Sequence, residues 1–187
     1  IGVLQHAIKN VDKWTKDEKR PSNVDRPFFI RMLMGFLGSK SYIKYQPLGT
    51  VGVISPWNFP VNLILAPLGG IFAAGNRAMI KPSELTPATS EVTKRMFEAY
   101  FDKSEAAVFT GDAEVGAAFS ALPFDHLLFT GGTQIGKKVM KAASDNLVPV
   151  TLELGGKSPV IVDENADLSD VAKKVMRGKT MNAGQIC

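Results

Sequence analysis

The spacing of apolar and polar side chains changes character near residue 47. Within residues 1–20, apolar side chains recur every three or four positions and the lysines lie away from them, which predicts an amphipathic helix. A loop with two prolines follows. Residues 41–46 then alternate polar and apolar, as an exposed antiparallel strand does, and Pro47 confines that strand to a sheet edge. We therefore expect residues 1–46 to form a helix, a loop and an antiparallel edge strand.

From residue 47 onward, short apolar runs alternate with segments of helical periodicity. The expected strands are 50–55, 78–81, 107–110, 127–130, 150–153 and 159–162. The expected helices are 61–74, 87–101, 112–120, 134–144 and 168–179. Short, continuously apolar strands separated by helices are typical of βαβ units in a parallel sheet that is covered on both faces. Residues 47–187 are thus expected to form a doubly wound, Rossmann-like α/β domain.

Composition and charge narrow the class of protein. The 187 residues are 45% hydrophobic and 21% charged, which is typical of a soluble globular domain. The net charge of +4 arises in residues 1–46, which carry nine Lys or Arg and four Asp or Glu, against thirteen and fourteen in the remainder. No basic run is dense enough to indicate a nucleic-acid partner.

The sequence also bears on the cellular compartment. The most apolar stretch, 61–74, is interrupted by Pro67 and Gly69. It is shorter than the roughly 20 residues that a membrane span requires, so a buried helix is expected there. Cys187 is the only cysteine, which excludes an intrachain disulfide framework and favours a reducing compartment. With no secretory signal visible, we expect a cytoplasmic protein.

Cys187 is a candidate nucleophile, because a thiol is the most nucleophilic side chain near neutral pH. The small, loop-forming residues before it favour an accessible sulfur. An inert buried cysteine is the alternative, and it is the more common state of an isolated cysteine.

Asn58 is a candidate oxyanion donor. It follows the first predicted strand of the domain, and prolines at 56 and 60 restrict the backbone around it. Ligands bind at the carboxyl ends of parallel strands in such sheets, and a fixed side-chain amide there can stabilise a developing oxyanion. The alternative is that Asn58 caps the helix that begins near Pro60.

Two further segments follow predicted strands. Glu153 lies directly before Leu-Gly-Gly, where a buried carboxylate of raised pKa suits a general base; an ion pair with Lys157 or another lysine is the alternative. The glycine-rich segment 131–136 opens a helix, so its free N–H groups and the positive helix end suit a phosphate. Many such turns bind nothing, and that alternative stays open. His6 and His126 have no partners at ligand spacing, so we expect no metal site.

Together these segments resemble the aldehyde dehydrogenase superfamily, in the order that is usual for it. They are Pro-Trp-Asn-Phe-Pro at 56–60, Lys-Pro-Ser-Glu at 81–84, Phe-Thr-Gly-Gly-Thr-Gln-Ile-Gly at 129–136, Glu-Leu-Gly-Gly-Lys at 153–157 and Asn-Ala-Gly-Gln-Ile-Cys at 182–187. The resemblance extends from about Tyr42 to Cys187. Residues 148–157, 45–49 and 122–126 look like the class 3 and coniferyl aldehyde dehydrogenase branch, which acts on hydrophobic and often aromatic aldehydes. Gly132 stands where many members have serine.

The resemblance implies a role for each candidate. Cys187 would attack the aldehyde, Asn58 and the Cys187 N–H would stabilise the oxyanion, and Glu153 would activate the water that releases the acid. Lys81 and Glu84 would hold the adenosine ribose, so NAD is expected and NADP is not excluded. On the residue type alone, Trp57 is more often a core aromatic, and for Lys81 with Glu84 the alternative is a solvated pair in a turn. The residues implied to bind the cofactor are Ile54, Ser55, Trp57, Lys81, Ser83, Glu84, Gly111, Thr130, Gly131, Gly132, Thr133, Gly136, Leu154 and Gly155.

The resemblance also implies that the chain is the cofactor-binding part of an enzyme, cut at its cysteine, with the catalytic domain absent. Residues 1–46 would then belong to the oligomerisation element of a homodimer or homotetramer, and the fragment alone would be inactive. The alternative is a non-catalytic nucleotide-binding or interaction module that kept the motifs. An acyl-transferring relative is a weaker alternative, because Glu153 favours hydrolysis.

Overall fold

The computed structural model describes residues 2–21 and 25–187. Its central sheet has five parallel strands in the order β5-β4-β3-β6-β7. The strands are β3 (Thr50–Ile54), β4 (Arg77–Lys81), β5 (Ala106–Val108), β6 (His126–Gly131) and β7 (Val150–Leu154). From β3, the chain adds β4 and then β5 on one side. It then crosses over and adds β6 and β7 on the other side of β3. The predicted doubly wound parallel sheet is confirmed, and its order reverses between β3 and β6.

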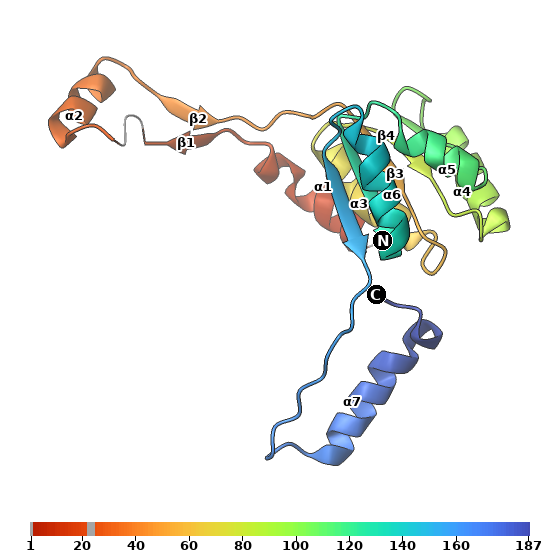
Figure 1. Cartoon of the computed structure of the whole chain (residues 1–187). Helices are drawn as coiled ribbons and strands as arrows, with labels where there is room; N and C mark the ends of the chain where they lie inside the picture. The colour runs from red at the N-terminus through yellow and green to blue at the C-terminus, as the bar shows by residue number, and fades with distance from the viewer. Residues whose placement is uncertain (1, 22–24) are drawn as a thin grey trace.

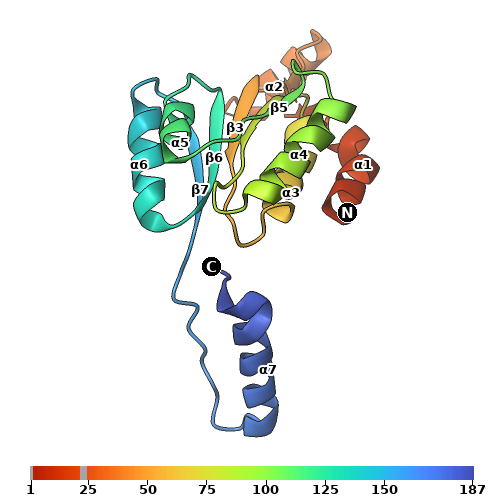
Figure 2. The same ribbon diagram turned by 90° about the vertical axis from the view of Figure 1, so that its right-hand side faces the viewer.

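Helices cover both faces of this sheet (Figure 2). One face carries α3 (Asn62–Ala73) and α4 (Pro87–Tyr100), and the other carries α5 (Ala113–Ser120) and α6 (Thr133–Ser144). The first core lies under α3 and α4 and includes Val53, Ile80 and Phe97. The second lies under α5 and α6 and includes Leu127 and Val139. The continuously apolar strands are explained by this burial on both faces.

The N-terminal segment differs from the prediction in two places. The helix expected over 1–20 ends early, as α1 (Gly2–Trp14), because no apolar residue continues its stripe between Trp14 and Arg20. Instead β1 (Glu18–Arg20) pairs antiparallel with β2 (Ser41–Ile43) in a separate ribbon. The strand expected at 41–46 is therefore antiparallel, as predicted, but it is shorter and does not border the main sheet.

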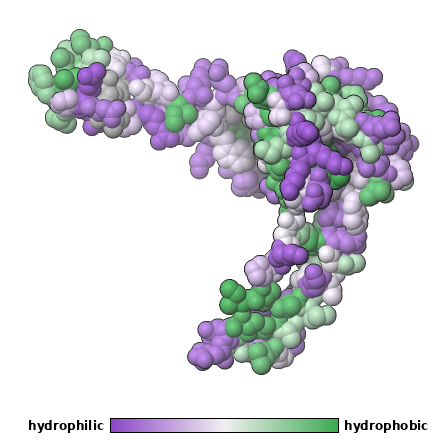
Figure 3. All heavy atoms as spheres, in the orientation of Figure 1, coloured by the Kyte–Doolittle hydropathy of each residue, from purple (hydrophilic) through white to green (hydrophobic). Residues whose placement is uncertain are grey.

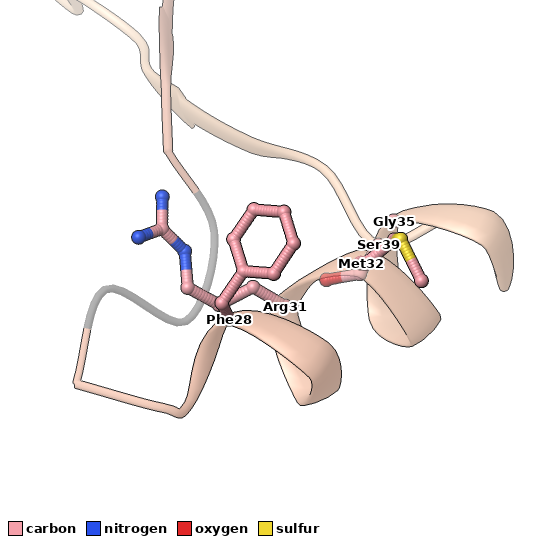
Figure 4. Close-up of a pocket in the computed structure, with 5 residues that line it drawn as sticks. All are labelled: Phe28, Arg31, Met32, Gly35 and Ser39. Carbon is pink, nitrogen blue, oxygen red and sulfur yellow. The ribbon is translucent and has the colours of Figure 1, made fainter.

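The predicted loop after β1 contains a helix, α2 (Phe28–Phe36), which was not expected. The ribbon carries α2 away from the sheet, and apolar side chains gather at its tip (Figures 1 and 3). Phe28 and Phe36 are 80% and 89% exposed, and Phe28 and Arg31 border a shallow hollow beside the helix (Figure 4). Nearly every residue of α2 is apolar, so the run has no helical periodicity to detect.

The C-terminal segment also departs from the prediction. No strand forms at 159–162, where Ile161 is 94% exposed and the chain runs without a neighbouring strand. A short apolar run becomes a strand only where a partner can pair with it. The predicted helix follows as α7 (Leu168–Thr180), below the sheet in Figure 1. No helix within the described ranges is long and apolar enough to cross a membrane.

Candidate active site

A cleft of about 490 Å³ lies at the carboxyl ends of β3, β4 and β6, where the strand order reverses. This is the place at which ligands bind in doubly wound sheets. The predicted cofactor residues that line it are Ile54, Ser55, Trp57, Lys81, Ser83, Glu84, Thr130, Gly131 and Gly132. Trp57 is 44% exposed, so it forms part of the cleft wall rather than the core.

Lys81 supplies a buried positive charge in this cleft. Its side chain is 3% exposed, and its Nζ lies 2.8 Å from Oε2 of Glu84, which is 44% exposed. The hydrogen bond from Lys81 is the main cause that lowers the pKa of the Glu84 carboxyl below 4.5. A lowered pKa keeps Glu84 ionised at neutral pH, and the pair is lost only as the pH falls through that lowered value. The alternative of a solvated pair is thus wrong for Lys81.

Several polar groups in or next to the cleft lack partners within the described part of the chain. The Ser55 Oγ atom is buried and makes no hydrogen bond, although the Ser55 N–H donates to the Lys81 carbonyl at 3.1 Å. At the start of α6, the N–H groups of Thr133 and Gln134 have no backbone acceptor. Buried polar atoms are normally paired, and a helix N-terminus favours an anion. The arrangement therefore fits a phosphate-bearing ligand.

One wall of the cleft was not predicted from the sequence. It consists of Ala113, Gly116, Ala117 and Ser120 on α5 and of Ile135, Lys138, Val139 and Ala142 on α6. In both sets the residues have the spacing i, i+3, i+4, i+7. In a sequence, this spacing indicates one face of a helix, and that face is normally assigned to the core. The sequence feature that could have distinguished a cleft wall from a core face is side-chain size, because the α5 set contains only small side chains. Small side chains leave a slot between the two helices that suits a flat apolar group.

Five residues predicted to bind the cofactor do not line this cleft: Gly111, Thr133, Gly136, Leu154 and Gly155. Gly136 instead lets α6 approach β7, because a Cβ there would lie 2.9 Å from Cδ2 of Leu154. Gly111 has a φ of 153° in the turn before α5, where a Cβ would lie 2.5 Å from Val115. For these two glycines, the structure shows a packing or turn requirement.

The last residues of the chain fold back onto the loop after β3. We call residues 182–187 the Cys187 loop. Asn58 Nδ2 donates to the Gln185 carbonyl at 2.6 Å, and Asn182 Nδ2 donates to the Asn58 carbonyl at 2.9 Å. The Gly156 N–H donates to the Cys187 carbonyl at 2.6 Å. The structure thus brings Asn58 and the segment that ends at Cys187 together at the carboxyl end of the sheet.

The alternative for Asn58 is not supported. Helix α3 has Val61 as its N-cap residue, and no side chain caps it, so Asn58 is not a helix cap. One Asn58 amide hydrogen has no acceptor among the described residues, and its Oδ1 is buried without a partner. Cys187, the last residue described, is exposed. Asn58 thus has a free amide hydrogen and lies beside the Cys187 loop, whose thiol is accessible.

Glu153 differs from its prediction. It lies on β7 opposite Thr130, but its side chain is exposed, so the expected burial is wrong. Successive side chains of a strand point to opposite faces of the sheet. Leu152 and Leu154 pack on the core under α5 and α6, so Glu153 points to the opposite face. Glu153 forms none of the ion pairs found in the described residues, and it makes no hydrogen bond to Asn58 or Cys187 there.

No metal centre accompanies these groups in residues 2–21 and 25–187. No three His, Cys, Asp or Glu side chains in those ranges are grouped so that they could hold a metal ion. His126 begins β6, and its Nε2 lies 2.8 Å from the Thr151 hydroxyl.

Comparisons with known proteins show which family the chain is similar to. Residues 6–187 match the model of the aldehyde dehydrogenase family. A probable coniferyl aldehyde dehydrogenase of Caulobacter vibrioides is 59% identical over 187 residues, which are all of this chain and 37% of that protein. The substrate-bound structure of Staphylococcus aureus AldH superposes with a TM-score of 0.87 at 45% identity, covering 100% of this chain and 39% of that one.

A more distant structure is the Mycobacterium tuberculosis aldehyde dehydrogenase complexed with NAD+. It superposes with a TM-score of 0.83 at 31% identity and covers 100% of this chain and 36% of that one. The chain therefore spans a little over a third of the length of these relatives. Since the family model matches almost the whole sequence, the chain belongs to the aldehyde dehydrogenase family.

Proposed function

We propose that the complete enzyme carrying this chain oxidises an aldehyde to a carboxylic acid with NAD or NADP, through a thioester on Cys187. The observation that carries the proposal is the contact between Asn58 and the Cys187 loop, in which Asn58 Nδ2 lies 2.6 Å from the Gln185 carbonyl. This contact joins an amide donor to a thiol-bearing loop, next to the motif segments that border the cleft.

The first step forms the bond between Cys187 and the substrate. The Cys187 thiolate attacks the carbonyl carbon, and the carbonyl π electrons move onto oxygen. The free amide hydrogen of Asn58 and the Cys187 N–H, which donates to no described residue, then stabilise the oxyanion. Fixed donors of this kind act without reorganising during the reaction.

The cleft fits a nicotinamide dinucleotide. When bound, that cofactor supplies the acceptor for the hydride that leaves the substrate carbon. Glu84 and the unpaired Ser55 hydroxyl line the cleft, and they suit the adenosine ribose and a phosphate of the cofactor. The free N–H groups of Thr133 and Gln134 lie next to the lining residues Gly132 and Ile135, where they could also bind a phosphate. The slot between α5 and α6 suits a flat base.

Glu153 completes the reaction as the general base. Its carboxylate takes a proton from water, the water oxygen attacks the thioester carbonyl, and the Cys187 thiolate leaves with its electron pair. The products are the free acid and the regenerated thiolate. The exposed position of Glu153 leaves its carboxylate accessible to water.

Replacing Glu153 with glutamine in the complete enzyme tests this reaction. Because only deacylation needs the base, we expect one rapid equivalent of NADH per site, followed by turnover that is roughly a hundredfold slower. Stopped-flow absorbance of NADH measures both phases, and the exposed Glu91→Gln on α4 serves as the matched control. The proposed function would be refuted if the wild-type enzyme formed no NADH with any aldehyde of a panel. Unaltered steady turnover by Glu153→Gln would refute the role of the base.

The substrate class that we propose is the hydrophobic or aromatic aldehydes. The support is the identity of 59% to a probable coniferyl aldehyde dehydrogenase of Caulobacter vibrioides and of 55% to a coniferyl aldehyde dehydrogenase of a Pseudomonas species. The aldehyde panel therefore includes coniferyl aldehyde and an aliphatic aldehyde of similar length.

We also propose that Glu84 makes the enzyme prefer NAD over NADP. A carboxylate beside the ribose repels a 2′-phosphate, whereas an amide does not. Glu84→Gln is expected to lower the ratio of NAD to NADP affinity roughly tenfold, a modest change because Glu84 is partly exposed and screened. Fluorescence titration with each dinucleotide measures the ratio, with Glu98→Gln on α4 as control. An unchanged ratio would show that Glu84 does not select the cofactor.

A further inference from the structure

The Cys187 loop turns through an unusual backbone conformation. The φ angles of Asn182 and Ala183 are 48° and 56°, and Gly184 follows at 76°. The left-handed region strains most L-residues, and asparagine is among the few residues other than glycine that tolerate it. Glycine at position 182 would adopt this turn with less strain. The turn itself therefore does not require the Asn182 side chain.

That side chain joins two distant segments. Asn182 Nδ2 donates to the Asn58 carbonyl at 2.9 Å, across 124 positions in the sequence. The Asn182 carbonyl accepts from the N–H and the Nε2 of Gln185, both at 3.0 Å. Asn58 Nδ2 closes the ring by donating to the Gln185 carbonyl at 2.6 Å. Three residues thus hold each other in a cycle of hydrogen bonds.

We infer that Asn182 is the positioning residue for the oxyanion donor Asn58, an inference that rests on the proposed function. Asn58 lies in irregular chain between β3 and α3, and its carbonyl accepts no hydrogen bond from the described residues except that of Asn182. Without Asn182, only the bond to Gln185 would place the Asn58 amide. The Asn182 side chain donates its hydrogen bond to the Asn58 backbone, so it acts through Asn58.

A misplaced donor loses most of its effect on the transition state, whereas substrate binding in the ground state changes little. The cost of losing Asn182 should therefore fall on kcat rather than on KM. A residue that only shapes the turn would behave differently, because glycine would replace it without loss.

Asn182→Gly and Asn182→Asp in the complete enzyme separate these roles. Glycine keeps the left-handed turn and removes the donor, while aspartate keeps the shape and sets an acceptor against the Asn58 carbonyl. We expect kcat to fall roughly ten- to a hundredfold in both, with KM within about twofold of wild type. The loss in Asn182→Asp, relative to wild type, should shrink as the pH falls toward the ordinary aspartate pKa of about 3.9, because a carboxylic acid can donate. The loss in Asn182→Gly should not depend on pH.

Two further measurements isolate the oxyanion step. Hydrolysis of 4-nitrophenyl acetate needs no dinucleotide: the Cys187 thiolate attacks the ester carbonyl, nitrophenolate leaves, and water then releases acetate. The loss in Asn182→Gly should reappear there. In an Asn58→Ala background, Asn182→Gly should cost nothing more, since residues that act as one unit are not additive. Asn165→Gly, which removes another exposed loop asparagine, is the matched control.

The outcomes distinguish the inference from the proposed function. If the wild-type enzyme turns over neither aldehyde nor ester, the proposed function fails and the inference fails with it. If the wild-type enzyme is active but Asn182→Gly keeps its kcat, the inference alone is overturned. It is also overturned if Asn182→Gly lowers kcat equally with and without Asn58.

Discussion

Aldehyde oxidation by the complete enzyme is expected to disappear when Cys187 is replaced by serine. A serine hydroxyl is almost wholly protonated at neutral pH, and no described base contacts position 187 to activate it. The loss in kcat/KM should reach roughly four orders of magnitude or more. The side chain is exposed, so the fold and the dinucleotide affinity should be unchanged. NADH absorbance measures the activity, and fluorescence titration measures the affinity.

A chemical control tests the same thiol without a substitution. Iodoacetamide should inactivate the wild-type enzyme at the rate at which mass spectrometry detects alkylated Cys187. Prior incubation with an aldehyde should slow both the inactivation and the alkylation of Cys187. Retention of more than a tenth of the wild-type activity by Cys187→Ser would show that another group is the nucleophile.

Replacing Asn58 with alanine is expected to lower kcat by roughly two to three orders of magnitude, with little change in KM. The amide stabilises charge that exists only after the thiolate has attacked, so its loss raises the barrier and leaves substrate binding unchanged. Asn58→Asp should lose at least as much, because a carboxylate repels the oxyanion. Steady-state kinetics with a saturating dinucleotide measures both variants.

The Asn58→Ala variant also loses a bond to the Cys187 loop, and alkylation separates that effect. Iodoacetamide reacts with the thiolate without forming an oxyanion, so its rate at Cys187 should be close to wild type in Asn58→Ala. Asn10→Ala on α1, where the side chain donates only to the His6 carbonyl, is the control and should change neither rate. A fall in the alkylation rate as large as that in kcat would show that Asn58 supports the thiol rather than the oxyanion.

The predicted strands and helices of the sheet domain agree with the structure because their signals are local. The run that ends at Lys81 and the helix that follows at 87–101 each carry their pattern within a few neighbouring residues. The strand predicted at 159–162 failed for the converse reason. Its apolar residues have the composition of a strand, but no strand lies beside them.

Some residues of the site were predicted correctly and others were not, again because the signals in a sequence are local. Motif residues such as Lys81 and Gly131 lie in the cleft, because strand ends and glycine turns can be recognised in a sequence. The α5 face that includes Gly116 was not predicted, since a helix face against a ligand and one against the core have the same spacing. The burial of Glu153 was predicted wrongly, because a local pattern does not specify what covers the face of the sheet to which a strand residue points.

By itself, the sequence determined the succession of strands and helices between residues 50 and 154, the parallel α/β class and the family, since these depend on periodicity and on short motifs of adjacent residues. Only the tertiary structure decided the strand order, the slot between α5 and α6 and the hydrogen bonds between Asn58 and the Cys187 loop. Those features depend on contacts between residues up to 127 positions apart, and no local pattern of side chains specifies which distant partner a residue will meet.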